Sequence, residues 1–224
     1  MPKKAKKDVF GYGICALRAR HPEIRKLKRL HSPSFHGYRV WTSSWLLMDF
    51  LERQGLKDGT RVMDLGCGWG LAGIYCAKNH SAEVTGVDLD SQVFPYLHLH
   101  AQINSVKITT VQKDFDSLTG INLEDIDVLI GADICFWDTL ADSLRNLIYR
   151  ALDHGVKLVV IADPGRPTFN ELGQVFVDDL HGEISNRAVI DPHYICGRIL
   201  KIGSLCAPVN ETTYAGSVLS ALPN

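Results

Sequence analysis

The sequence predicts an α/β fold in which a parallel sheet is wrapped by helices. From residue 61 onward, short runs rich in β-branched residues alternate with segments of helical periodicity. This alternation is typical of strand–helix–strand units. The chain has 224 residues, of which 46% are hydrophobic and 22% charged. It therefore suits one large domain, or a core domain with a short appendage.

Seven segments are expected to be strands, because each is short, apolar and bounded by turn-forming or polar residues. All seven follow residue 60, and the last two come late in the chain. They are Arg61–Leu65, Glu83–Leu89, Lys107–Val111, Ile126–Ala132, Val156–Ala162, Glu183–Ile190 and Tyr194–Ile202.

Four segments are expected to be helices, two of them because apolar residues recur at intervals of three and four. Asp138 is placed as the N-cap of the third helix, and Pro95 suits the first turn of the second. The segments are 41–54 (ending before Gly55), 95–104, 140–151 and 169–180.

Charge is unevenly distributed along the chain. The formal net charge is −1, yet residues 1–31 carry ten Lys or Arg against only Asp8 and Glu23. Such a run is typical of a solvated terminus, and a nucleic-acid contact is the alternative. We expect a basic N-terminal arm at 1–34, a main domain at 35–205 and a polar C-terminal tail at 206–224.

Several classes of protein do not fit the sequence. No apolar run approaches the roughly 18 to 20 residues that span a bilayer, and the start lacks an apolar export stretch. The sequence therefore predicts a cytoplasmic protein. Its six cysteines form no Cys-x-x-Cys pair, so neither a zinc site nor a disulfide is expected.

A glycine-rich loop directly follows the first predicted strand. Glycine at positions 66, 68 and 70 lets the backbone turn sharply and approach a ligand closely. A dinucleotide-binding G-x-G-x-x-G pattern fails, because its sixth position is Leu71. Asp64 ends the strand, where a carboxylate can accept hydrogen bonds from loop amides or from a cationic ligand but would repel a pyrophosphate.

A second acidic residue, Asp88, lies near the end of the second predicted strand. A carboxylate at this place can accept hydrogen bonds from both hydroxyls of a ribose. After the third strand, Asp114 could bond an exocyclic amine of adenine and Phe115 could pack on the purine. Each of these two residues fits a strand-end turn or a core position equally well.

Three motifs resemble the seven-strand, Rossmann-like S-adenosylmethionine-dependent methyltransferases. They are His36-Gly-Tyr-Arg-Val-Trp41, Asp64-Leu-Gly-Cys-Gly-Trp-Gly70 and Ile130-Gly-Ala-Asp-Ile-Cys-Phe136. The resemblance covers roughly residues 35–202 and is strongest to a methyltransferase-like group that includes protein-lysine methyltransferases. It implies a three-layer α/β sheet and S-adenosyl-L-methionine as the cofactor. By the same resemblance, the cofactor pocket is lined by Trp41, Gly66, Cys67, Gly68, Asp88, Phe115 and Ala132.

The acceptor side of the expected site lies after the fourth predicted strand. The lysine methyltransferases of the group typically read Asp-x-x-Tyr, and this chain has Asp133-Ile-Cys-Phe136. We expect Asp133 to orient an incoming amine and Phe136, with Trp137, to wall its channel. The alternative for Asp133 is a helix cap. Arg166, after the fifth strand, is either part of the site or a solvated residue of a Pro-Gly turn.

Three readings of function remain open from the sequence. A protein-lysine methyltransferase is favoured. An RNA or small-molecule amine methyltransferase is the alternative, although Gly131-Ala-Asp-Ile lacks the Asn-Pro-Pro-Tyr motif typical of nucleic-acid amino-group enzymes. A catalytically silent adaptor that binds the cofactor and a partner is the third reading.

Overall fold

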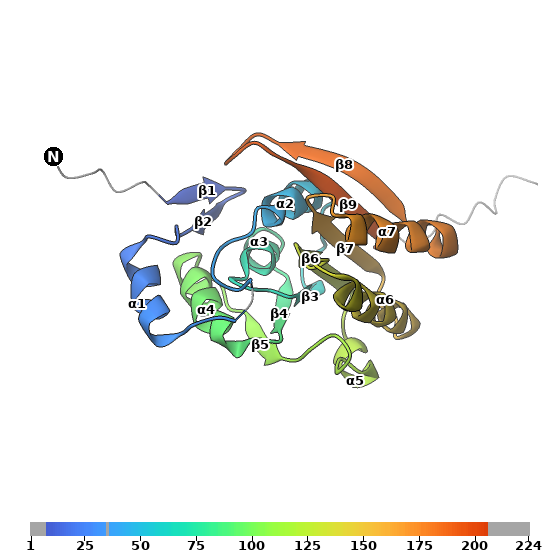
Figure 1. The fold of residues 1–224 in the computed structure, drawn as a ribbon, viewed down its shortest axis with the longest axis horizontal. Helices are drawn as coiled ribbons and strands as arrows, with labels where there is room; N and C mark the ends of the chain where they lie inside the picture. Colours follow the sequence, from blue (N-terminus) through green and yellow to red (C-terminus); the bar gives the residue numbers. More distant parts are fainter. Residues whose placement is uncertain (1–7, 35, 206–224) are drawn as a thin grey trace, which may run out of the picture.

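A computed structural model describes residues 8–34 and 36–205 of the protein. Its core is a seven-stranded sheet with helices on both faces (Figure 1). The strand order is β5-β4-β3-β6-β7-β9-β8. The strands are β3 (Arg61–Leu65), β4 (Glu83–Asp88), β5 (Thr109–Gln112), β6 (Val128–Ala132), β7 (Leu158–Asp163), β8 (Glu183–Val189) and β9 (Ile195–Gly203).

All seven predicted strands are confirmed, with ends that differ by up to two residues. The expectation of a parallel sheet was incomplete. β3 to β7 pair in parallel, but β9 runs antiparallel to both β7 and β8. The connection from β8 to β9 is a short loop, which can join only antiparallel neighbours.

Helices cover the sheet in two layers. One layer contains α2 (Ser43–Gln54), α3 (Leu71–Asn79) and α4 (Phe94–Ile103); the other contains α6 (Asp138–Asp153) and α7 (Pro167–Leu180). Each layer encloses its own buried apolar cluster against the sheet. A short helix, α5 (Gly120–Leu123), precedes β6, and a 3-10 turn (Ser91–Val93) precedes α4.

The placement of Asp138 as a helix cap is wrong. Trp137 has extended backbone angles and is the N-cap of α6, whereas Asp138 is the first helical residue. An acidic side chain in the first turn still interacts favourably with the helix dipole. The four predicted helices are otherwise present, and α3 and α5 were not among them.

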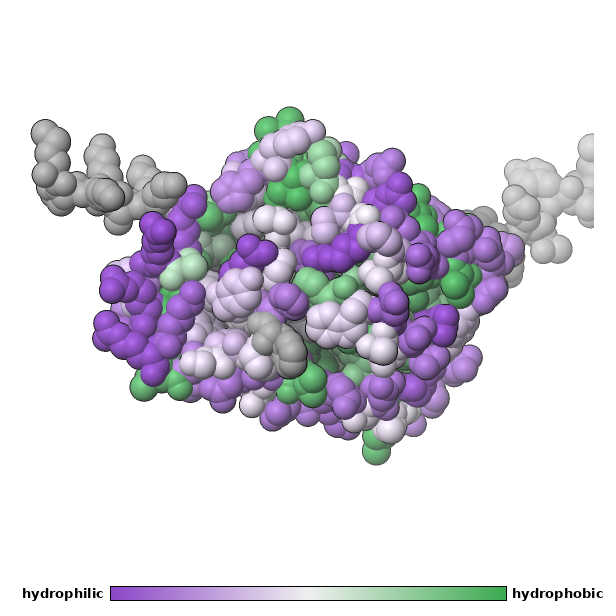
Figure 2. All heavy atoms as spheres, viewed as in Figure 1, coloured by the Kyte–Doolittle hydropathy of each residue, from purple (hydrophilic) through white to green (hydrophobic). Residues whose placement is uncertain are grey.

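The described part of the basic arm is folded. It forms a hairpin of β1 (Val9–Gly11) and β2 (Ile14–Ala16), then helix α1 (Pro22–Leu30). Ile24 and Leu17 are buried with Trp69 and Tyr96, which fastens this segment to α4. The cations of α1 point outward, and hydrophilic residues gather over this helix in Figure 2.

The tail at 206–224 and the first seven residues lie outside the described part of the chain. Among the residues that the structure describes, no helix is both long and apolar enough to cross a membrane.

Candidate functional site

The loop between β3 and α3 is built on three left-handed glycines. Gly66, Gly68 and Gly70 have φ of 58°, 51° and 75°, a region that other L-residues avoid. Space is also restricted at two of them. A Cβ on Gly66 would lie 2.7 Å from Ile134 Cγ2, and one on Gly70 would lie 2.5 Å from Leu97 Cγ. Conformation therefore favours glycine at all three positions, and packing requires it at Gly66 and Gly70 as well.

Asp88 joins this loop to the end of β4. Its Oδ2 accepts a hydrogen bond from the Gly68 amide at 3.0 Å, and its Oδ1 accepts one from the Asp90 amide at 3.0 Å. Burial raises the pKa of the Asp88 carboxyl, and the two amide bonds partly oppose that shift. Each oxygen keeps a second lone pair, so the carboxylate can still accept two hydroxyl groups.

Asp64 is the more deeply buried of the two carboxyls, with 4% exposure. Its Oδ2 accepts a hydrogen bond from the Gly73 amide at 3.0 Å, inside the first turn of α3. Burial raises the pKa of Asp64 to about 8, against the lowering effect of that bond. A buried acid of this kind favours a cationic partner.

A small pocket opens between this loop and residues 39–44. Its volume is about 30 Å³, and it is partly open to solvent. Arg39 and Trp41 form one wall, and the Arg39 guanidinium lies 3.9 Å from the centre of the Trp41 ring. The lining residues include Trp41, Asp64, Gly66, Cys67, Gly68 and Ala132, so six of the residues expected around a cofactor are brought together.

The chemistry of these groups fits S-adenosylmethionine. The buried Asp64 carboxyl suits its cationic amino-acid end, and the Asp88 carboxylate suits vicinal ribose hydroxyls.

Asp114 and Phe115 do not line the pocket. The Asp114 carboxylate accepts a hydrogen bond from the Ser117 amide at 2.6 Å, which closes a turn. Hydrogen bonds from the Ser117 hydroxyl and the Ser117 amide lower the pKa of Asp114. Phe115 is packed in the core on the α6 side of the sheet. Their expected contacts with adenine stay predictions.

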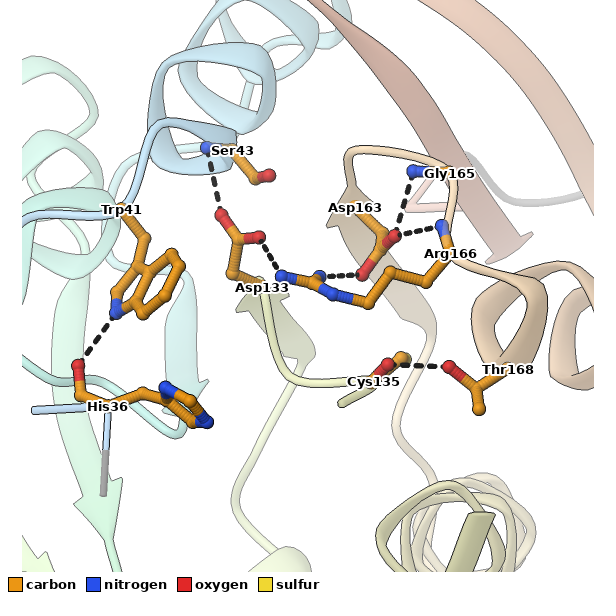
Figure 3. A network of polar contacts seen from close by, with 9 residues as sticks. All are labelled: His36, Trp41, Ser43, Asp133, Cys135, Asp163, Gly165, Arg166 and Thr168. Atoms are coloured by element: carbon orange, nitrogen blue, oxygen red, sulfur yellow. Dashed lines mark hydrogen bonds and ion pairs between the residues drawn. The ribbon is translucent and has the colours of Figure 1, made fainter. Parts of the chain in front are cut away.

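Asp133 is the centre of a buried ion network (Figure 3). Its Oδ1 lies 2.9 Å from Arg166 Nη2, and its Oδ2 accepts a hydrogen bond from the Ser43 amide at 3.1 Å. Arg166 also pairs with Asp163, at 2.5 Å from Nη1 to Oδ2. Asp133 has φ of 59°, an unusual left-handed geometry for a residue with a side chain. The network ties the ends of β6 and β7 to the start of α2.

Aromatic rings surround Phe136 on the outer side of this network. The His36 ring stacks on Phe136 with centroids 4.1 Å apart and an interplanar angle of 15°. The Trp41 ring meets Phe136 edge-on at 5.3 Å. The Arg166 guanidinium lies 4.3 Å from the Phe136 centroid. Because both groups cannot occupy one face, Phe136 is held between His36 and Arg166.

The segment at 31–41 is fastened to the glycine loop and α4. Trp69 donates its Nε1–H to the Gly37 carbonyl at 2.9 Å, and Tyr96 donates its hydroxyl to the His31 carbonyl at 2.8 Å. Trp41 donates its Nε1–H to the His36 carbonyl at 2.8 Å. One stretch of chain thus contributes both a wall of the pocket and the ring that covers Phe136.

Sequence reasoning missed Asp163, Ser43 and His36 as site residues. For Asp163 a signal existed, since its spacing of three from Arg166 allows an ion pair across the turn after β7. No such signal existed for the Ser43 amide, because a backbone hydrogen-bond donor does not depend on the residue type.

The chain is similar to known methyltransferases. Residues 62–155 match a family model described as a methyltransferase domain. The electron transfer flavoprotein beta subunit lysine methyltransferase of Xenopus laevis is 30% identical over 141 residues, which cover 60% of this chain and 56% of that protein. The chain thus spans about half the length of the curated relatives it matches.

Two further comparisons extend this picture. A ribosomal protein L11 methyltransferase of Acetivibrio thermocellus is 36% identical over 75 residues, 34% of this chain and 23% of that protein. The crystal structure of precorrin-6y C5,15-methyltransferase from Geobacter metallireducens GS-15 has a TM-score of 0.57 at 13% identity. The match covers 79% of this chain and 95% of that one, and it supports the fold alone.

Proposed function

We propose that this chain, a seven-strand Rossmann-like domain of the S-adenosylmethionine-dependent methyltransferase class, transfers a methyl group to the side-chain amine of a protein lysine. The matching relatives that act on a protein subunit support this acceptor. S-adenosylmethionine, when bound, supplies an electrophilic methyl group on a sulfonium, and the transfer is a direct displacement. Positioning of the amine and exclusion of water are then what the protein contributes.

The observation that carries the proposal is the composition of the acceptor side. Asp133 and Asp163 share a single guanidinium, so this buried network has a formal charge of −1. The aromatic wall of Phe136 and Trp41 lies beside it. An apolar wall next to excess negative charge suits a side chain with a long aliphatic stem and a cationic end.

The residues on the cofactor side would bind the two ends of S-adenosylmethionine. Asp64 and the glycine loop would face its amino-acid end, and Asp88 would accept hydrogen bonds from its ribose. Trp41 and Ala132 would lie between the cofactor and the acceptor, since both line the pocket.

For Asp133 and Phe136 we propose roles on the acceptor side. Asp133 is 4% exposed and both of its oxygens have partners, so it would act by holding Arg166 and the start of α2 in place. Phe136, whose two faces are covered by His36 and Arg166, would form part of the channel wall by holding the His36 ring in place. The role of Asp133 is tested by the Arg166 substitution described in the Discussion.

An RNA acceptor is a second candidate, supported by one observation. Arg25, Lys28 and Arg29 are exposed on α1, at spacings that place them on one side of the helix. Such a face attracts phosphates in general. No base-reading arrangement accompanies it among the described residues.

The deciding experiment is methyl transfer from radiolabelled S-adenosylmethionine into a lysate that lacks this protein. We expect a discrete protease-sensitive, nuclease-resistant band whose hydrolysate contains labelled methyl-lysine. The Asp88→Asn protein is the control for carry-over of label. A nuclease-sensitive signal would support the RNA acceptor, and cofactor binding without any transfer would support a silent adaptor.

A further inference from the structure

A methyltransferase that acts on lysine must remove a proton before the amine can react. A lysine side chain has an ordinary pKa near 10.4, so at pH 7 only about one in a few thousand is neutral. The ammonium has no lone pair with which to attack. A group near the acceptor channel therefore has to take up this proton.

The carboxylates on the acceptor side are poorly suited to that task. Asp133 and Asp163 are both buried and both bonded to Arg166. A proton added to either would weaken its pairing with the guanidinium. Asp64 lines the pocket beside the glycine loop, and its carboxyl accepts a hydrogen bond from the Gly73 amide.

Two further titratable side chains lie here: Tyr38, whose ring centroid is 6.4 Å from that of Trp41, and His36. A neutral phenol is a far weaker base than a neutral imidazole, so His36 is the better candidate. Its ring stacks on Phe136 and meets the Trp41 ring edge-on, with centroids 5.5 Å apart. It is half-buried, and neither ring nitrogen has a hydrogen-bond partner among the residues that the structure describes. The other charged groups near these rings are Arg166 across Phe136 and Arg39 across Trp41, and arginine does not titrate in this range.

We propose that His36 is the catalytic proton acceptor for the incoming amine, an inference that rests on the proposed lysine acceptor. A neutral imidazole nitrogen takes one proton from the lysine ammonium and becomes an imidazolium. The freed lone pair of the amine forms the new nitrogen–carbon bond as the sulfur–carbon bond of the cofactor breaks. The sulfur keeps that electron pair, the product amine stays protonated, and the half-exposed imidazolium releases its proton to water.

Two substitutions of the stacked His36 ring distinguish a catalytic role from a purely structural one. Phenylalanine has a flat ring of similar size, so His36→Phe preserves the packing on Phe136 but removes both nitrogens. His36→Ala removes the ring and leaves room for free imidazole. His98→Ala is a matched control, because His98 is exposed on α4.

The first test measures the rate of methyl transfer to the labelled lysate band at saturating cofactor. General base catalysis typically contributes about 10²- to 10⁴-fold. We expect the rate to fall by that factor in His36→Phe and His36→Ala and to stay unchanged in His98→Ala. Added imidazole should raise the rate of His36→Ala by at least about tenfold. A full rate in His36→Phe, or no recovery with imidazole, would overturn the proposal.

The second test does not depend on activity. Diethylpyrocarbonate reacts with an accessible, unprotonated imidazole nitrogen, so peptide mass spectrometry of the whole protein at pH 7 should find His36 modified. An unreactive His36 would overturn the proposal. Affinity for S-adenosylhomocysteine, measured by calorimetry, should stay within about twofold in both His36 variants if the residue acts on the acceptor alone. Failure of the wild-type protein to transfer any methyl group would instead overturn the proposed function, and this role with it.

Discussion

The Gly68 amide donates a hydrogen bond of 3.0 Å to the Asp88 carboxylate, and this contact holds the glycine loop against the end of β4. Two adjacent parallel strands thereby present their loop and their carboxylate to the same side of the sheet. The ligand-binding edge of such sheets lies at the carboxyl ends of the strands.

Substitution of Asp88 by Asn should weaken binding of S-adenosylhomocysteine by about 10- to 100-fold, because hydrogen bonds to a charged group contribute about 1.5 to 3 kcal/mol. Isothermal titration calorimetry measures this affinity. Asp125→Asn is the control, since the side chain of Asp125 is 87% exposed. Removal of a carboxyl whose pKa is raised by burial should leave the melting temperature of the free protein unchanged or higher. An unaltered affinity would rule out the ribose contact.

Stability of the ligand-free protein should fall as pH rises toward 8. The pKa of Asp64 is raised to about 8 in the folded protein, from 3.8, so the folded state binds more protons than the unfolded state between these values. The stability that this bound proton gives the folded state is fully present below about pH 3.8 and is lost as pH rises through about 8. Urea unfolding at pH 6, 7 and 8.5 should show the decline. If the free energy of unfolding of the Asp64→Asn protein falls with pH as steeply as that of wild type, this prediction is contradicted.

Gly70→Ala and Gly59→Ala form a matched pair. Both glycines have positive φ, 75° and 74°, so both substitutions incur a backbone penalty of about 1 to 2 kcal/mol. Only at Gly70 would the new Cβ meet a side chain, Leu97 at 2.5 Å, whereas at Gly59 nothing lies within 4 Å. We expect a further loss of about 1 to 3 kcal/mol at Gly70, measured by urea unfolding. Equal losses would show that Leu97 yields without cost.

Arg166→Met should lower the free energy of unfolding by about 3 to 5 kcal/mol, because it leaves the buried Asp133 and Asp163 carboxylates without their partner. Arg145→Met is the control. Its ion pair with Asp142 is exposed, and such pairs contribute about 0 to 1 kcal/mol. If Asp133 orders the acceptor channel, methyl transfer by the Arg166 variant should fall at a temperature where it is still folded, with its affinity for S-adenosylhomocysteine retained.

The sheet could be predicted because its strands carry local signals. β3 and β4 are apolar runs, with Asp64 as the second-last residue of β3 and Asp88 as the last residue of β4. The three glycines that follow β3 have left-handed backbone angles that favour glycine. The direction of β9 depended on pairing with β8, which is a property of two strands together. The hairpin β1–β2 and helix α1 were hidden by the excess of Lys and Arg, because the apolar residues that anchor them, chiefly Ile14 in β2 and Ile24 in α1, are few.

The cofactor side of the site could be predicted to a larger extent than the acceptor side. Trp41, Asp64, Cys67 and Ala132 do line one pocket. The pairing of Asp133 with Arg166 joins positions 33 apart, and the stacking of His36 on Phe136 joins positions 100 apart. Contacts between distant segments follow from the topology of the sheet, and no local pattern encodes them.

Ile134 lies where the two halves of the site meet. A Cβ on Gly66 would lie 2.7 Å from Ile134 Cγ2, and one on Gly131 would lie 2.5 Å from Ile134 Cδ1. One aliphatic side chain thus occupies the space left by two missing methyl groups, one of them in the cofactor loop. Amino-acid substitutions at these three positions therefore depend on one another. At 131, where the backbone is not left-handed, a larger residue is tolerated only when 134 loses its Cδ1, so related chains that have lost Gly131 should carry Val or Ala in place of the isoleucine. At 66 the left-handed backbone is a second reason to keep glycine.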